Sequence, residues 1–387
     1  MKMMHIGDLH LGKTLGDFDL KDDQEYMLDQ LLKIVDEHSV DAVLIAGDIY
    51  DKAIPSEAAT RMLDYFLSNL AKRQVSTYMI SGNHDSDERL NYGSGLFETN
   101  RIFISAKYEG KLCKKVLKKG DEEIDIYLLP FVKASQVRHY HPEAEIENYE
   151  DAVRAIIDSA DIDPTRCNII VAHQFVKGSS EDPDLSGSEC LGTQVAGTVE
   201  KIGYKCFDMF DYVALGHIHS AQQVGRKEIR YAGTPLKYSL KEVHHEKSVT
   251  LFTVSGKGKV DIDLPLLKFK PLRDLRHLKG KLRDLLDSSN VTDPDDYIYA
   301  TLTDEEIIND VMNIFRQTYP NTVKIDYDNS HTREVEQVDI SKIAENRSFA
   351  DLVSDFYRQI YGSEISEEEM DVMRDVAREA GVLHEAD

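Results

Sequence analysis

The chain has 387 residues, with 46 Lys and Arg against 70 Asp and Glu, and a formal net charge of −24. This charge argues against a protein that coats nucleic acid or an anionic membrane with its whole surface. Hydrophobic residues make up 41% of the chain, so it can build a sizeable core, and its length predicts two to three domains. Its cysteines form no C-x-x-C pair, no run reaches the roughly 18 apolar residues of a membrane helix, and the N-terminus lacks a secretory pattern. We therefore expect a cytoplasmic protein that does not enter the membrane.

Short apolar runs recur through the first 232 residues, and most end in small or polar residues. Continuous rather than alternating hydrophobicity predicts strands that are buried on both faces. The runs are residues 3–6, 42–46, 76–80, 168–172, 212–215 and 229–232. Apolar residues at helical spacing lie between the early runs, at 22–38 and 55–72. This alternation predicts a layered α/β core over residues 1–265.

The sequence changes character after residue 265. A basic run, 268–283, is followed by strand-like segments at 297–302 and 322–326 and by a helical pattern near 304–317. These elements predict a small α+β domain over residues 266–340.

Residues 341–387 form a third segment with an apolar stripe at helical spacing. The stripe consists of Phe349, Leu352, Val353, Phe356, Tyr357 and Ile360. A helix packed on its own domain and a helix laid into a partner's groove both fit such a stripe. A second helix is predicted after the acidic residues that follow.

Metal-type ligands follow five of the predicted strands. They are Asp8 and His10, Asp48, Asn83, His173, and His217 and His219. In an open α/β sheet, loops at the carboxyl ends of the strands bring such groups together. Four of these motifs place a glycine directly before the first ligand, which permits a sharp exit from the strand and a close backbone approach. Asp8 and His10, like His217 and His219, are i, i+2 pairs, so on an extended backbone both side chains of a pair project to one side.

The ligand types predict a catalytic metal site rather than a structural zinc cage. Carboxylate, amide and imidazole groups without thiolates suit Mn²⁺, Mg²⁺, Fe or Zn²⁺. The set is too large for one ion, whereas two ions about 3.5–4 Å apart that share a carboxylate would suit phosphoryl chemistry. Such ions would attract phosphate even in a chain of net charge −24.

The series D-x-H, G-D-x-x-D, G-N-H-D, H and G-H-x-H, in this order, resembles that of the calcineurin-like metallophosphoesterases. It resembles more closely their bacterial DNA-repair branch, the SbcD-type nuclease subunits, which also carry a loop like YAGTPL at residues 231–236. The resemblance implies a two-layered β-sandwich flanked by helices, a small α+β capping domain and C-terminal helices.

The resemblance also implies roles for individual residues. One ion, usually Mn²⁺, would be held by Asp8, His10, Asp48 and His219. A second Mn²⁺ would be held by Asp48, Asn83, His173 and His217, so that Asp48 bridges the two. His84 would stabilise or protonate the leaving oxygen, and Asp51 would orient His84.

An SbcD-type chain is expected to act as the nuclease subunit of a complex of two SbcD with two SbcC ATPase subunits, in DNA repair, recombination and replication. Cleavage would be Mn²⁺-dependent, 3′–5′ exonucleolytic on duplex ends and endonucleolytic on hairpins and single strands, with ATP control through SbcC. The C-terminal stripe would then dock on SbcC, residues 55–72 are a candidate for a homodimer contact, and we expect the protein at the nucleoid in the cytoplasm.

Three alternatives stay open at this point. The same scaffold serves small-molecule phosphatases and cyclic-nucleotide phosphodiesterases, and a scaffold protein with a vestigial metal site would carry a similar sequence. The basic run is either a solvated face or a DNA contact. Its candidate DNA-binding residues are Lys268, Lys270, Arg273 and Arg276.

Overall fold

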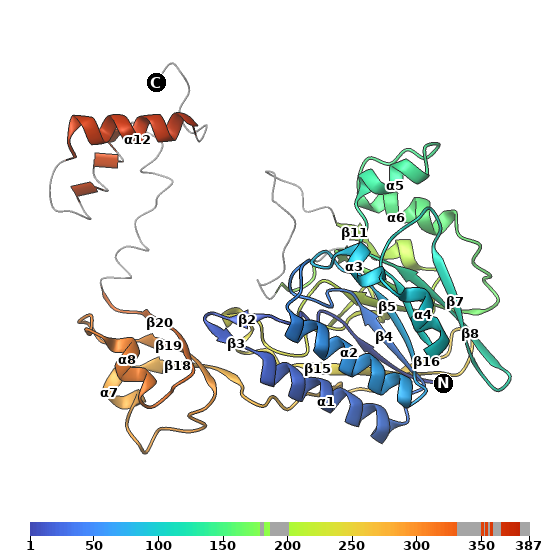
Figure 1. The fold of residues 1–387 in the computed structure, drawn as a ribbon, viewed down its shortest axis with the longest axis horizontal. Helices are drawn as coiled ribbons and strands as arrows, with labels where there is room; N and C mark the ends of the chain where they lie inside the picture. Colours follow the sequence, from blue (N-terminus) through green and yellow to red (C-terminus); the bar gives the residue numbers. More distant parts are fainter. Residues whose placement is uncertain are drawn as a thin grey trace. The chain divides into compact units, whose positions relative to one another are not determined.

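The computed structural model describes residues 1–178, 182–185, 201–330, 350–351, 353–354, 357–358 and 365–379. The chain divides into two compact units (Figure 1). The first consists of Met1–Thr301 and Asn309–Asp326, and the second of Leu302–Ile308 and Tyr327–Asp387. The candidate site lies in the first unit.

The first sheet of this unit holds seven strands, in the order β16-β15-β1-β4-β5-β6 with β17 paired to β15. Strands β1, β4, β5 and β6 are parallel, and β15 runs antiparallel to β1. The strands are β1 (Lys2–Ile6), β4 (Ala42–Ala46), β5 (Ser76–Ile80), β6 (Ile102–Ser105), β15 (Ser248–Val254), β16 (Val260–Ile262) and β17 (Leu267–Lys268). Strands β4 and β5 have the predicted bounds and are buried throughout.

The second sheet holds six strands, in the order β13-β14-β12-β9-β8-β7. Its four inner strands are parallel, and the two outermost are antiparallel to their neighbours. The strands are β7 (Cys113–Lys119), β8 (Glu122–Leu129), β9 (Cys167–His173), β12 (Tyr212–Gly216), β13 (Gln222–Val224) and β14 (Arg226–Tyr231). The predicted run at 229–232 thus forms the second half of β14.

The two sheets pack face to face, and helices cover their outer faces. Because side chains alternate along a strand, Leu44 points into the layer between the sheets and Ile45 points to the helices. In this inner layer, hydrophobic side chains of the first sheet pack against those of the second sheet, which include Ile169 and Tyr212. The outer helices are α1 (Lys21–His38) and α2 (Glu57–Lys72) on the first sheet, and α5 (Ala134–Tyr140) and α6 (Tyr149–Asp158) on the second. The expected sandwich flanked by helices is confirmed.

Local signals explain where α2 begins. The Ser56 side chain accepts a hydrogen bond from the Ala59 amide at 3.2 Å, which caps the first turn. The Tyr65 hydroxyl donates to Asp29 at 2.7 Å and so links α2 to α1. Shorter elements of the first unit are β2 (Thr14–Leu15), β3 (Phe18–Asp19), α3 (Asp87–Asn91), α4 (Ser94–Phe97), β10 (Val176–Lys177) and β11 (Ile202–Gly203).

A separate three-stranded sheet, β18-β19-β20, follows the sandwich in sequence. Its elements are β18 (Leu275–Gly280), α7 (Leu282–Leu285), β19 (Tyr297–Leu302), α8 (Val311–Arg316) and β20 (Thr322–Tyr327). Strand β19 has the predicted bounds. The helix predicted near 304–317 is shorter than expected, because Asp310 at its N-terminus has a left-handed φ of 56° and α8 begins only after it.

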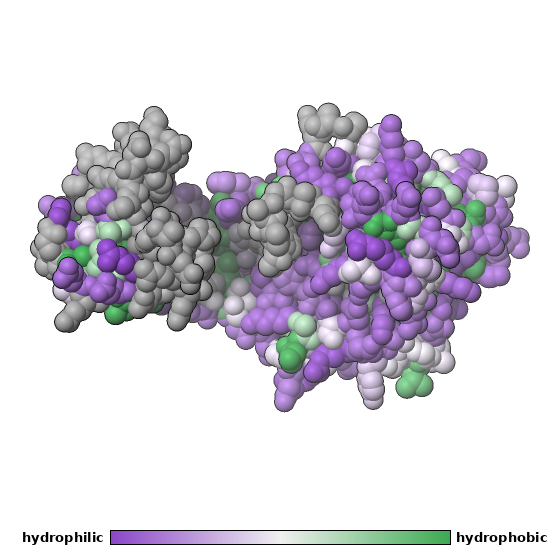
Figure 2. Space-filling view, turned by 90° about the horizontal axis from the view of Figure 1, so that it is seen from above, coloured by the Kyte–Doolittle hydropathy of each residue, from purple (hydrophilic) through white to green (hydrophobic). Residues whose placement is uncertain are grey.

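Helix α12 (Glu367–Glu379) follows in the second unit, where a second helix was predicted. Of the apolar stripe, Val353 and Tyr357 are helical, and Phe349, Leu352, Phe356 and Ile360 lie outside the described residues. No helix within the described ranges is long and apolar enough to cross a membrane. The face drawn in Figure 2 is mainly hydrophilic with small, separate hydrophobic patches.

Candidate metal centre

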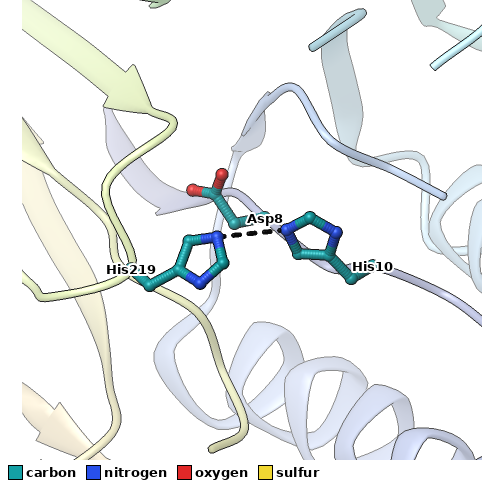
Figure 3. Close-up of side chains that lie close together, drawn as sticks. All are labelled: Asp8, His10 and His219. Carbon is teal, nitrogen blue, oxygen red and sulfur yellow. Dashed lines mark hydrogen bonds between the residues drawn. The ribbon is translucent and has the colours of Figure 1, made fainter. Parts of the chain in front are cut away.

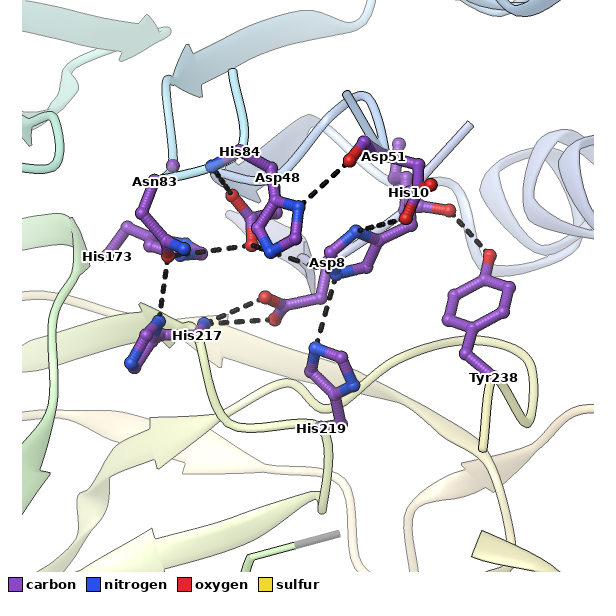
Figure 4. A network of polar contacts seen from close by, with 12 residues as sticks. Asp8, His10, Asp48, Asp51, Asn83, His84, His173, His217, His219 and Tyr238 are labelled. Carbon is purple, nitrogen blue, oxygen red and sulfur yellow. Dashed lines mark hydrogen bonds and ion pairs between the residues drawn. The ribbon is translucent and has the colours of Figure 1, made fainter. Parts of the chain in front are cut away.

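The predicted ligands meet at one end of the sandwich (Figure 4). Asp8 and His10 follow β1, Asp48 follows β4, Asn83 follows β5, His173 ends β9, and His217 and His219 follow β12. One ligand atom each from Asp8, His10 and His219 lies within 4.8 Å of the others, and the same holds for Asp8, Asp48 and His173. The structure therefore brings together strand ends from both sheets.

The first cluster is formed by Asp8, His10 and His219 (Figure 3). The Nε2 atoms of His10 and His219 face each other at 3.2 Å. Asp48 Oδ2 lies 3.7 Å from His10 Nε2. The three side chains of this cluster thus turn oxygen or nitrogen atoms toward one small space, and the Asp48 carboxylate lies at the edge of that space.

The second cluster centres on the amide oxygen of Asn83. This oxygen lies 3.0 Å from His173 Nε2 and 2.9 Å from His217 Nδ1. His173 Nδ1 donates to the Ala46 carbonyl at 2.8 Å, so its Nε2 faces the cluster, 3.4 Å from Asp48 Oδ2. Asp48 consequently lies between the two clusters, where a bridging ligand would be.

The backbone that carries these ligands is not extended. Asp8, His10, Asp48 and His217 all have a left-handed φ, of 51°, 44°, 47° and 98°. The expectation that the i, i+2 pairs lie on extended backbone is therefore wrong, because β1 ends at Ile6 and the chain turns sharply after it. Such conformations cost about 1–3 kcal/mol each in non-glycine residues and cluster at functional sites.

Two of the glycines that precede the ligands, Gly82 and Gly216, lie where the ends of strands from different parts of the chain approach each other closely. A Cβ on Gly82 would lie 2.1 Å from Asp48 Oδ1, and one on Gly216 would lie 1.8 Å from the Ala46 carbonyl oxygen. Real side chains do not approach so closely. The glycines therefore permit the backbone packing on which the clusters depend.

Burial sets the electrostatics of the clusters. It raises the pKa of Asp8 to about 6 and lowers the pKa of His10 well below its usual value. Burial alone would also raise the pKa of Asp48, but the neighbouring imidazoles of His173, His10 and His84 together outweigh it and hold this pKa below its usual range. Burial alone would lower the pKa of His173, but the carboxylates of Asp48 and Asp8 and the Ala46 carbonyl together raise it to about 9.

The donor set fits divalent cations. Two buried carboxylates, an amide oxygen and imidazole nitrogens converge without thiolates, which matches Mn²⁺, Fe²⁺ or Zn²⁺ in a catalytic setting. His10 Nδ1 is buried and makes no hydrogen bond to the residues that the structure describes. Bound cations would neutralise the negative charge of the buried carboxylates, because the other side chains of the clusters are mostly imidazoles.

His84 and Asp51 contact each other through the backbone carbonyl of Asp51, and not through its carboxylate. His84 Nδ1 donates to the backbone carbonyl of Asp51 at 2.9 Å. The Asp51 carboxylate instead accepts from Lys13 Nζ at 2.6 Å and lies 3.7 Å from His10 Nδ1. The His84 amide donates to Asp48 Oδ1 at 2.9 Å. His84 is therefore fixed beside the Asp48 carboxylate with its Nε2 turned to the site.

Asp85 is a site residue that the sequence reasoning did not single out. Its buried carboxylate accepts from the amides of Ile49, Tyr50 and Gly82, at 3.1, 2.9 and 2.9 Å. Burial raises its pKa to about 6. Asp85 thus ties the loop after β4 to the loop after β5, and its place in G-N-H-D was the signal that could have identified it.

The candidate DNA-binding residues of the basic run have partners of their own. Arg273 pairs with Asp23, Arg276 Nε lies 2.7 Å from Asp296, and Lys268 lies 2.7 Å from Glu246. Lys270 is exposed. The two arginines hold the β18-β19-β20 segment together or fix it to α1, so Lys268 and Lys270 are the exposed residues among these four candidates.

Comparison with known proteins agrees with this geometry. Residues 1–221 match the family model described as calcineurin-like phosphoesterase. Residues 271–361 match the model described as type 5 capsule protein repressor C-terminal domain. The chain is 31% identical over 381 residues to the SbcD chain of the SbcCD nuclease of Staphylococcus epidermidis, with 97% of each chain covered. The chain belongs to the SbcD family of calcineurin-like phosphoesterases. A metallophosphoesterase domain of this kind uses divalent metal ions.

Two solved structures are similar to parts of this SbcD-family chain at low sequence identity. Yfce, a phosphoesterase from E. coli, is 13% identical, covers 65% of this chain and 88% of its own, and has a TM-score of 0.27. A dimetal phosphatase from Danio rerio is 12% identical, covers 68% and 98%, and has a TM-score of 0.35.

Proposed function

We propose that this SbcD-family chain is the nuclease subunit of an SbcC–SbcD complex and hydrolyses phosphodiester bonds of DNA. The observation that carries the proposal is the position of Asp48 between two clusters of buried oxygen and nitrogen donors. The match of 97% of the chain to the SbcD chain of an SbcCD nuclease supports the same function.

The proposed cofactor is a pair of Mn²⁺ ions. Asp8, His10, Asp48 and His219 would hold one, and Asn83, His173 and His217 would hold the other together with Asp48. Two such ions supply positive charge for the phosphate and lower the pKa of a water molecule used as the nucleophile.

His84 is the proposed proton donor to the leaving oxygen. Because Nδ1 donates to the Asp51 carbonyl, Nε2 is the nitrogen that would give up a proton from the imidazolium form of the ring. Nε2 lies 4.0 Å from Asp48 Oδ2, and the side chain is 16% exposed, so a substrate can reach it. Asp51 acts as a positioning residue through its carbonyl, and its carboxylate holds Lys13 beside the site.

The second unit is the proposed contact for SbcC. Val372, Met373 and Val376 of α12 are 61, 41 and 56% exposed, so this helix presents apolar side chains to solvent. Together with the stripe that includes Val353 and Tyr357, they supply an amphipathic surface for a partner's groove. Val372→Asp with Val376→Asp should abolish binding to SbcC in a titration, whereas Ile307→Asp, an exposed apolar control, should not.

The proposed homodimer contact lies on α2 and the short helices after β5. Tyr65, Tyr92 and Leu96 are 45, 85 and 76% exposed there, and Tyr92 and Phe97 line a cavity of about 300 Å³. Burial of such side chains would favour association. Leu96→Glu should convert a dimer to a monomer in sedimentation analysis. A dimer that persists would place the contact elsewhere.

Exposed lysines of the basic run, Lys268 and Lys270, are the proposed DNA contacts of the capping segment. They would add a local, salt-sensitive contribution to binding in a chain whose net charge is −24. We place the complex at the nucleoid in the cytoplasm, with roles in DNA repair, recombination and replication.

The decisive experiment is cleavage of a linear duplex and of a hairpin with Mn²⁺, with and without SbcC and ATP. We expect 3′–5′ degradation of duplex ends and incision of hairpins, both strongest with SbcC and ATP. Fast hydrolysis of a phosphomonoester or a cyclic nucleotide with DNA left intact would overturn the proposal in favour of a small-molecule phosphoesterase.

A further inference from the structure

The segment after β14 places a buried ion pair directly behind one of the proposed metal ligands. The Glu242 side chain is fully buried, and Lys247 is 8% exposed. Their atoms Oε2 and Nζ are 2.5 Å apart. No part of the proposed mechanism accounts for this pair, and a buried ion pair is seldom retained for stability alone.

The pair is joined to the loop that carries His219. Lys247 Nζ donates to the His219 carbonyl at 3.1 Å and to Thr234 Oγ1 at 2.7 Å. The Thr234 amide also donates to the His219 carbonyl, at 3.1 Å. The backbone of His219 is therefore held from two sides by the segment that carries the ion pair.

The Glu242 carboxylate also faces the His219 ring. Its Oε2 accepts from Lys247, and its Oε1 faces His219 Nδ1 at 3.8 Å. The opposite ring nitrogen, Nε2, faces His10 Nε2 in the first cluster. The ring thus lies between a carboxylate and the proposed cation.

We infer that Glu242 is a positioning residue for metal binding, which holds His219 with Nδ1 protonated and Nε2 directed at the cation. The inference rests on the proposed two-cation site and adds a residue to it. A carboxylate behind a ligating imidazole fixes its tautomer and raises its basicity. His173 obtains the same orientation from the Ala46 carbonyl, a neutral group. Lys247 makes burial of the Glu242 charge tolerable and links its position to the His219 backbone.

The test is calorimetric titration of the full-length chain, freed of metal, with Mn²⁺ alone. The parental chain should bind two ions. Glu242→Gln should weaken one of the two sites about 10- to 100-fold and leave the other unchanged. The matched control is Glu246→Gln, which removes an exposed carboxylate paired with Lys268 and should leave both sites at parental affinity.

A second variant separates positioning from folding. Glu242→Gln leaves the buried Lys247 charge without its carboxylate and should lower the melting temperature, whereas Glu242→Gln with Lys247→Met removes both charges and should recover much of it. We expect the double variant to keep the weakened Mn²⁺ site. If metal affinity returns together with the melting temperature, or if Glu242→Gln binds both ions normally, the inference is overturned. A parental chain that binds no second ion would instead overturn the proposed function.

Discussion

The backbone amide of His217 donates to both carboxylate oxygens of Asp8, at 2.9 and 3.1 Å. The two residues follow strands in different sheets, β1 and β12, and stand 209 positions apart in the sequence. One hydrogen-bonded carboxylate therefore joins the two layers of the sandwich at the candidate site. Its orientation is set by the packing of the sheets, so the geometry of the site depends on how closely the strand ends approach.

Gly82→Ala tests this dependence. The added Cβ would lie 2.1 Å from Asp48 Oδ1 and 2.4 Å from the Asp48 amide nitrogen, so the Asp48 loop must move. We expect Mn²⁺-dependent DNA cleavage to fall about 10²-fold, because a shift near 1 Å in a reacting group has that effect. Single-turnover cleavage of a labelled duplex measures it.

Gly95→Ala is the matched control for this substitution. A Cβ at Gly95 meets nothing within 4 Å, so cleavage should stay at the parental rate, and stability should not fall because alanine favours the helix α4 more than glycine does. A Gly82→Ala variant that cleaves as fast as the Gly95→Ala variant would show that the site tolerates movement of the Asp48 loop.

The strands and ligands of the core could be predicted because they rest on local signals. Strands buried on both faces give unbroken apolar runs, and β4 and β5 have the predicted bounds. Ligands placed directly after such runs must gather at one edge of the sandwich, as the clustering of Asp8, Asp48 and His173 shows.

Contacts between residues remote in sequence could not be predicted in the same way. The partner of Arg273 is Asp23, 250 residues away, so the charge of Arg273 read alone suggested a DNA contact. Asp51 contacts His84 through its backbone carbonyl, but the side-chain rotamer that turns the Asp51 carboxylate to Lys13 has no sequence signature. Left-handed φ values at Asp8 and Asp48 likewise follow from packing of the loops rather than from local preference.

His84→Gln should separate metal binding from cleavage. The hydrogen bond from His84 to Asp48 comes from the backbone amide, which glutamine keeps, so Mn²⁺ titration should still show two sites. Loss of the proton donor should slow cleavage about 10²- to 10⁴-fold. Cleavage at the parental rate with both ions bound would remove His84 from the mechanism.

Asp23→Ala should destabilise the junction between α1 and the segment that forms the β18-β19-β20 sheet. The Asp23 carboxylate is buried, pairs with Arg273 and accepts from the Tyr297 hydroxyl at 2.8 Å. Its removal leaves a largely buried guanidinium without its carboxylate, which costs about 3 kcal/mol. Urea unfolding followed by tyrosine fluorescence measures the change. Asp22→Ala, next to it on the exposed face of α1, should change the free energy of unfolding little.

A buried histidine beneath the site should make the metal-free chain sensitive to acid. The His5 ring is fully buried, its Nε2 donates to the Leu215 carbonyl at 3.2 Å, and its Nδ1 accepts from the Tyr212 hydroxyl at 3.0 Å. Burial, aided by Arg230, lowers the pKa of His5 to about 3. The folded state therefore keeps this ring neutral.

The sign of the effect follows from proton binding. Between pH 6.5 and about 3 the unfolded chain binds a proton at His5 that the folded chain does not, so stability is present above pH 6.5 and is lost as the pH falls. By pH 5 this one residue should have cost about 2 kcal/mol of the free energy of unfolding. Urea unfolding in EDTA at a series of pH values measures the slope.

His5→Gln isolates the contribution of this ring. Glutamine offers one donor and one acceptor but does not titrate, so the variant should be less stable at pH 7 and lose less stability between pH 7 and pH 5 than the parental chain. His139→Gln, which replaces an exposed histidine, is the control and should keep the parental slope. An unchanged slope in His5→Gln would mean that His5 becomes protonated in the folded chain as readily as in the unfolded one, which its two buried hydrogen bonds oppose.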